Sequence, residues 1–203
     1  VQVVGDVMRD ACQRFLPHAR KRYAELWFRP LGERFGVVTL HRSENTDDPA
    51  RLRDLAQGLR VVSDLIPLVV PLHPRTKVRL SQLNVSLPAS ACVIEPVGYL
   101  EMLALLDRCS MVITDSGGVQ KEAFYVGRPC ITARDETEWV ETVELGWNRL
   151  VGADPEAMLR ACESFLDSPP SVTREGLYGD GHASERIADV LARSIGLGAS
   201  KDG

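Results

Sequence analysis

The chain has 203 residues and a formal net charge of −4, and 44% of its residues are hydrophobic. This composition is typical of a soluble globular protein of one domain, or one and a half, and the acidic balance excludes a broad basic surface for nucleic acid or an anionic membrane. No apolar run reaches the ~18 residues that a membrane-spanning helix requires.

The chain opens on the apolar run Val1 to Val4, inside what looks like a structured segment, which suggests further sequence upstream. An Arg-rich segment then predicts an entry helix over residues 6–28. From residue 35 onward, short apolar runs alternate with segments of helical spacing. The predicted strands cover residues 35–40, 66–71, 91–94, 110–114, 130–133 and 149–151. The predicted helices cover residues 49–62, 76–83, 99–106, 119–126, 155–166 and 183–195, before a frayed tail over 196–203. Continuous apolar strands separated by helices predict an α/β fold with a doubly wound, Rossmann-like parallel sheet.

Five cysteines are an odd number at irregular spacings, and none belongs to a CxxC pair. This usage favours reduced, structural thiols and a cytoplasmic protein over a disulfide framework or a cysteine metal site.

A glycine pair follows one of the predicted buried strands. The strand ends at Thr114, Ser116, Gly117 and Gly118 follow, and a helix is expected to begin by residue 119. At such a junction, free backbone N–H groups and the positive end of the helix dipole face an anion. Glu122, one turn into the helix, can accept hydrogen bonds from both hydroxyls of a ribose. The alternative is a Ser/Gly helix cap without a ligand.

Three more polar clusters follow predicted strands. The first contains His41 and Arg42, the second is centred on His73, and the third runs over residues 134–141. The first alone is equally consistent with a solvated loop, and for the second and third alone a charged surface loop is the favoured interpretation. Since parallel strands place their carboxyl ends at one edge of a sheet, the four clusters together predict a ligand cleft there.

These segments resemble the family of non-hydrolysing UDP-N-acetylglucosamine 2-epimerases. The matching blocks are TLHRSEN (39–45), PLHPRT (71–76), EPVGYLEMLALL (95–106), the stretch 112–152 that contains TDSGGVQKEA and RDETE, and YGDGHASERI (178–187). The resemblance implies the second half of a GT-B architecture, whose N-terminal domain is absent from this chain. It divides the chain into a linker and entry helix (1–30), a nucleotide-binding Rossmann-like domain (31–181), and a C-terminal helix and tail (182–203).

The resemblance also implies the reaction. UDP-GlcNAc and UDP-ManNAc interconvert by elimination of UDP and its re-addition, with no redox cofactor and no catalytic metal, in an enzyme that is commonly a homodimer. By matching position, Ser116, Gly117 and Gly118 bind the diphosphate and Glu122 the ribose, while His41 is the active-site histidine. Arg42 and His73 match positions that touch a second, activating UDP-GlcNAc in regulated members. Because the carboxylates that move the C2 proton belong to the missing half, this chain alone is expected to be inactive.

One position departs from part of the family. Where some members have Arg-Pro after the RDxTE block, this chain has Trp139-Val140, which leaves Arg134 or Arg149 as substitute cations at the phosphate. The competing interpretations are a GT-B glycosyltransferase, a hydrolysing epimerase and a nucleotide-sugar-binding module without catalysis.

Overall fold

The computed structural model describes residues 1–24, 34–173 and 176–195, and contains a six-stranded parallel sheet. The strands are β1 (Gly36–Thr39), β2 (Leu68–Pro71), β3 (Cys92–Ile94), β4 (Met111–Thr114), β5 (Cys130–Thr132) and β6 (Asn148–Leu150). Their order across the sheet is β3-β2-β1-β4-β5-β6. The predicted doubly wound sheet is therefore confirmed, and the direction of winding reverses between β1 and β4.

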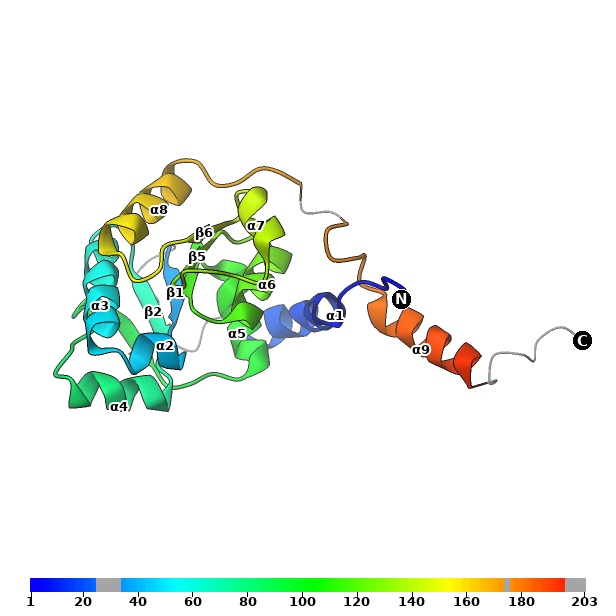
Figure 1. Ribbon diagram of the computed structural model, residues 1–203, viewed down its shortest axis with the longest axis horizontal. Coiled ribbons are helices and arrows are strands. Elements are labelled where there is room, and N and C mark those ends of the chain that lie inside the picture. Colours follow the sequence, from blue (N-terminus) through cyan, green and yellow to red (C-terminus); the bar gives the residue numbers. More distant parts are fainter. Residues whose placement is uncertain (25–33, 174–175, 196–203) are drawn as a thin grey trace, which may run out of the picture.

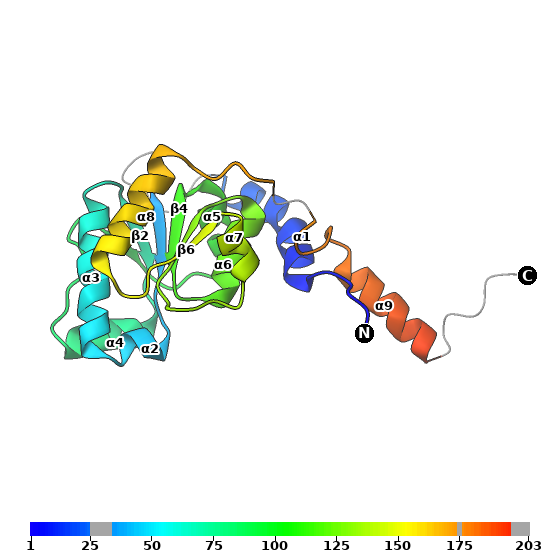
Figure 2. The same ribbon diagram turned by 45° about the horizontal axis from the view of Figure 1, so that its top comes forward.

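Helices cover both faces of the sheet (Figures 1 and 2). They are α1 (Val7–Arg22), α2 (Ser43–Thr46), α3 (Pro49–Ser63), α4 (Pro74–Gln82), α5 (Tyr99–Arg108), α6 (Gly117–Val126), α7 (Val140–Glu144), α8 (Pro155–Asp167) and α9 (Ala183–Ser194). Helices α3 and α8 lie on one face, α5 and α6 on the other, and α1 packs outside α5 and α6. The predicted tail over 196–203 and the end of the predicted entry helix lie outside the described residues.

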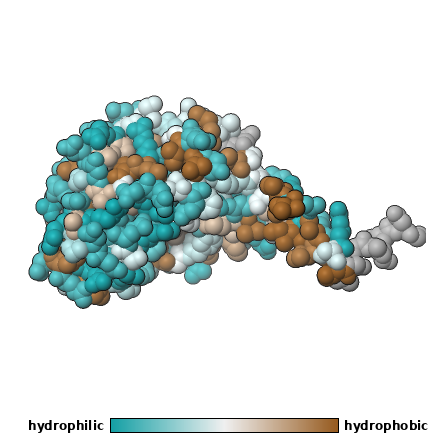
Figure 3. All heavy atoms as spheres, viewed as in Figure 1, coloured by the Kyte–Doolittle hydropathy of each residue, from teal (hydrophilic) through white to brown (hydrophobic). Residues whose placement is uncertain are grey.

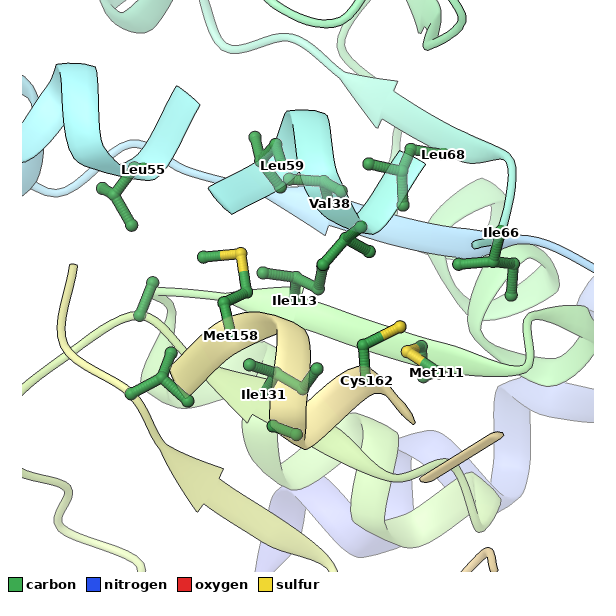
Figure 4. Close-up of a cluster of buried hydrophobic side chains, with 14 of the residues drawn as sticks. Val38, Leu55, Leu59, Ile66, Leu68, Met111, Ile113, Ile131, Met158 and Cys162 are labelled. Carbon is green, nitrogen blue, oxygen red and sulfur yellow. The ribbon is translucent and has the colours of Figure 1, made fainter. Parts of the chain in front are cut away.

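Strand β4 shows how the sheet builds two cores. Met111 and Ile113 point to the side of α3 and α8, where they pack with Leu59, Met158 and Cys162 (Figure 4). Val112 points to the opposite side and packs against α5 and α6. This two-residue alternation is the normal strand period. Because both faces are covered, every residue of the strand is apolar or hydrogen-bonded, which explains why it looked like an unbroken apolar run.

Four of the five cysteines are buried, and Cys92 is half-buried. All five cysteines are free, and burial raises the pKa of Cys109 and of Cys130 to about 12. At that pKa the nucleophilic thiolate is scarce at neutral pH, so these cysteines serve as small apolar groups.

The segments before α1 and before α9 run against each other. The amide of Asp6 donates to the carbonyl of Tyr178 at 3.0 Å, and the backbones at Gly5 and Gly179 approach so closely that a Cβ on Gly179 would lie 2.9 Å from the Cα of Gly5. Beyond this contact, α9 projects away from the sheet (Figure 1). Among the described residues, no helix is both long enough and apolar enough to cross a membrane.

Candidate functional site

The site lies at the carboxyl ends of β1 and β4, the neighbouring strands at which the winding of the sheet reverses. Ligands of open α/β sheets bind in the crevice outside such a switch point. His41 and Arg42 follow β1, and Ser116, Gly117 and Gly118 follow β4. The predicted convergence of these segments at one sheet edge is therefore confirmed.

Asp115 joins the two segments. Its side chain is fully buried and accepts hydrogen bonds from the amides of His41 (3.0 Å) and Arg42 (2.9 Å) and from the side-chain amide of Asn45 (3.1 Å). The His41 ring nitrogen Nδ1 lies 3.3 Å from the same carboxylate. A buried carboxylate must be satisfied by donors of this kind. Asp115 thus holds the loop after β1 against the loop after β4, and turns the Nδ1 edge of His41 inward.

Sequence reasoning did not single out Asp115. The available signal was its place, since an acidic residue directly after a predicted buried strand needs nearby hydrogen-bond donors if it is itself buried. The neighbouring pair Thr39 and Thr114, whose hydroxyls are 2.6 Å apart, closes the ends of β1 and β4 beneath it.

The glycine pair forms the first turn of α6, two residues earlier than predicted. Ser116 is the N-cap, and its hydroxyl oxygen accepts from the amide of Val119 at 3.4 Å, which leaves the hydroxyl hydrogen free to donate. As the first residues of the helix, Gly117 and Gly118 have no intrahelical acceptor for their N–H groups, which is the arrangement that binds anions. A Cβ on Gly117 would lie 3.8 Å from Nη2 of Arg42, so this guanidinium stands beside the loop.

Glu122 lies one turn further along α6. It is 9% exposed, and it makes no hydrogen bond or ion pair with any other residue that the structure describes. Burial raises the pKa of its carboxyl from 4.5 to about 7. Buried polar groups without partners are rare in native proteins because desolvation is costly. Glu122 is therefore a strong candidate for a group that a ligand completes.

An apolar pocket of about 170 Å³ adjoins the two histidines. The rings of His41 and His73 are 5.7 Å apart between centroids, and His73 caps α4 by accepting from the amide of Arg75. The remaining walls come from β1, β2, the loop before α5, α5 and α6: Thr39, Leu40, Pro71, Pro96, Val97, Met102 and Val119. Such a space suits a flat, largely apolar ring.

The two substitute cations do not reach the loop freely. Arg149 donates to the Ser164 hydroxyl and covers the Phe165 ring on α8, which corrects the suggestion that it replaces the missing arginine. Arg134 is 5% exposed and forms two hydrogen bonds to Glu138, which hold the pKa of that carboxyl at about 2, and an ion pair with Glu44. Of the three side-chain atoms nearest to a Cβ on Gly117, the cationic one belongs to Arg42.

Comparisons with known proteins agree with this geometry. A family model described as UDP-N-acetylglucosamine 2-epimerase matches residues 1–192. The chain is 45% identical to a UDP-2,3-diacetamido-2,3-dideoxy-D-glucuronate 2-epimerase from Pseudomonas aeruginosa and 37% identical to the UDP-N-acetylglucosamine 2-epimerase from Methanocaldococcus jannaschii, and these alignments cover 94% and 93% of it. A crystal structure of the M. jannaschii enzyme in complex with UDP-GlcNAc and UDP superposes on 95% of the chain with a TM-score of 0.87. The chain spans about half the length of these relatives, between 52% and 54%.

Proposed function

Because the chain belongs to the UDP-N-acetylglucosamine 2-epimerase family, we propose that it is the nucleotide-binding half of an enzyme that inverts C2 of a UDP-linked N-acetylhexosamine. The reaction removes the C2 proton and breaks the bond between C1 and the UDP oxygen. UDP then returns to C1 of the resulting glycal, and a proton returns to C2 on the other face. No redox change occurs, so the overall balance needs no electron carrier.

Glu122 is the observation that carries this proposal. Val119 and Glu122 are three residues apart and share one face of α6, which begins at the glycine pair. A nucleotide along that face has its diphosphate at Ser116, Gly117 and Gly118, its ribose at Glu122, and its base in the pocket that Val119 lines. The two ribose hydroxyls then supply the donors that the buried carboxylate lacks.

Arg42, His41 and His73 complete the proposed site. Arg42 stands beside Gly117, where its guanidinium neutralises the diphosphate, and His41 protonates or steadies the departing UDP. The resemblance also assigns Arg42 and His73 to a second UDP-GlcNAc site. Their position at the open edge of the cleft is compatible with that role, which stays a prediction.

The remaining half of the protein is the proposed partner of α9. Four apolar residues lie exposed on this helix at helical spacing: Ile187, Val190, Leu191 and Ile195 at its end. Figure 3 shows the apolar surface gathered there. The relatives are about twice as long as this chain. We propose that a domain equivalent to their additional one covers this face of α9 in the complete protein. The domain boundary at residue 31, a homodimer of the complete protein, and a cytoplasmic location consistent with the free cysteines also stay predictions.

A second substrate deserves a direct comparison because of one observation. Identity to the diacetamido-glucuronate 2-epimerase is 45%, against 37% to the M. jannaschii UDP-GlcNAc enzyme. Both reactions invert C2 of a UDP-sugar, so the nucleotide site serves either. Supplying the complete protein with each sugar nucleotide in turn, and measuring kcat/KM for both, identifies its substrate.

Titration with UDP tests the proposed site. We expect the amide signals of Gly117 and Gly118 to move in NMR spectra as UDP is added to this chain. The affinity should be ~10–100-fold weaker than that of the complete protein, because a lost charged hydrogen bond costs ~1.5–3 kcal/mol. If both amides stay unmoved at millimolar UDP, the loop is only a helix cap.

Changing Glu122 to Gln should alter binding and stability in opposite directions. The folded state holds the Glu122 proton up to about pH 7, whereas the ordinary pKa is 4.5. The contribution of Glu122 to stability is therefore fully present below pH 4.5 and is lost as pH rises through 7, by ~3 kcal/mol for a shift of this size. Gln removes that loss, so at pH 8 the melting temperature should rise while UDP affinity falls about tenfold.

The matched control for this change is Glu163→Gln, an exposed position on α8. It should change neither the pH dependence of unfolding nor UDP affinity. A lower melting temperature of Glu122→Gln at pH 8, combined with unchanged UDP affinity, would assign Glu122 to the fold and not to the ligand.

A further inference from the structure

Trp139 contacts the glycine loop directly. Its indole Nε1–H donates to the carbonyl of Gly117 at 2.9 Å, and a Cβ on Gly117 would lie 3.4 Å from the same nitrogen. In a planar trans peptide, the C=O of one residue and the N–H of the next point in opposite directions. By holding the Gly117 carbonyl, the indole therefore turns the Gly118 N–H away from itself. That N–H belongs to the open first turn of α6.

Lys121 holds the indole in turn. Lys121 is 4% exposed, and its Nζ lies 4.0 Å from the centroid of the Trp139 ring and 5.1 Å from that of the Tyr178 ring. Its ammonium also pairs with the carboxylate of Asp6. A desolvated cation over an indole face is among the stronger cation–π contacts. Rotation of the Trp139 ring would break this contact together with the bond to Gly117.

A purely structural role accounts for only part of the cluster. Asp6 caps α1 through the amide of Met8 and accepts from the Tyr125 hydroxyl, so an ion pair with Lys121 staples the entry segment to α6. The link between Asp6 and Lys121 does not require an indole N–H directed at the glycine loop. The hydrogen bond from Trp139 to Gly117 is therefore not explained by that structural role.

We propose that Trp139 and Lys121 are positioning residues for the glycine loop. Lys121 fixes the indole, and the indole fixes the Gly117 peptide, so that the Gly118 N–H faces the diphosphate. The pair supplies no further positive charge to the phosphate. It orients the Gly118 N–H toward the diphosphate without contacting the ligand. This inference rests on the proposed UDP site.

The test compares the affinities for UDP and for uridine. Uridine has no phosphates, so a change in the orientation of the Gly118 N–H should affect the binding of UDP alone. In the present chain, Trp139→Phe keeps an aromatic face for Lys121 and removes the N–H. We expect UDP affinity to fall ~2–10-fold, the range for one lost hydrogen bond, with uridine affinity unchanged. In the free protein, the Gly118 amide signal should shift.

Trp147→Phe is the matched control, because its indole donates to a backbone carbonyl at the same kind of distance, 3.0 Å, but at Val172. It should leave the ratio of UDP to uridine affinity unaltered. Lys121→Met, which keeps the length of the stem, should lower that ratio as Trp139→Phe does, measured well below the melting temperature, and Lys121→Arg should restore it in part.

Three outcomes overturn the inference, and they are distinguishable. Wild-type affinity for UDP from Trp139→Phe removes the positioning role and leaves the UDP site intact. An equal loss for UDP and uridine assigns Trp139 to the fold. If the unaltered chain binds UDP no better than uridine, the phosphate site itself is wrong, and the inference fails with it.

Discussion

UDP-GlcNAc should remain unchanged when it is incubated with this 203-residue chain, whereas the complete protein should convert it. Proton abstraction requires a base within ~3 Å of the C2 hydrogen on each face of the sugar. The described cleft offers an anion-binding turn, a carboxylate one turn further along the helix, and His41, which suit a phosphate, a ribose and a leaving group. We expect a sugar attached to that phosphate to extend out of the cleft, toward the proposed first half of the active site.

Proton NMR of the reaction mixture separates the competing activities. Without an acceptor, an epimerase makes UDP-ManNAc, a hydrolysing epimerase releases free ManNAc and UDP, and a glycosyltransferase or a binding module leaves the sugar as it was. The chain must bind UDP in the same sample for its inactivity to count. Turnover by the chain, after purification from a host that lacks its own epimerase, would contradict the division of the active site between two halves.

His41→Ala in the complete protein should lower kcat roughly 10²–10⁴-fold, the usual contribution of a general acid. Negative charge develops on the departing UDP as the bond to C1 breaks, and a contact with His41 strengthens as that charge grows. Because the contact is weaker in the ground state, KM should change much less than kcat. Steady-state kinetics of the two proteins measure this difference.

His18→Ala is the control for the loss of an imidazole, since His18 is exposed on α1 and its ring nitrogen Nδ1 lies 3.1 Å from the carbonyl of Arg14. Its kcat should equal that of the unaltered enzyme. If His41→Ala also retains full kcat, the contact of His41 with Asp115 is a loop anchor without a catalytic role.

The parallel sheet was predictable because strands that are buried on both faces have continuous apolar sequences. Each strand is a short apolar run, and each long helix has its own period. Two short helices were missed, α2 and α7, since four or five residues hold barely one turn and no periodicity can appear. Bonds to other elements hold them instead: Asn45 in α2 donates to Asp115 and to the carbonyl of Ala133, and the Thr142 hydroxyl in α7 accepts from the side-chain amide of Asn148 in β6.

The site was predictable to the level of segments and not of side chains. Parallel strands bring their following loops to one edge whatever residues those loops contain, so the convergence of residues 41–42 with 116–118 followed from topology. The direction of each side chain did not. Nothing in the spacing of Asp6, Lys121 and Trp139 indicates that they meet, and Arg149 carries the same charge as Arg42 but packs against α8.

The close passage of Gly5 and Gly179 has a consequence for how such enzymes are recombined. The segment before α1 and the segment before α9 meet at one crossing, and both glycines have positive φ, +101° and +94°, which other residues adopt only under strain. Under the proposed division into two halves, a chimaera that joins this half to the first half of another family member needs a compatible junction at this one crossing, and not at two distant places. We expect exchange of the whole module to be tolerated there only when neither glycine acquires a side chain.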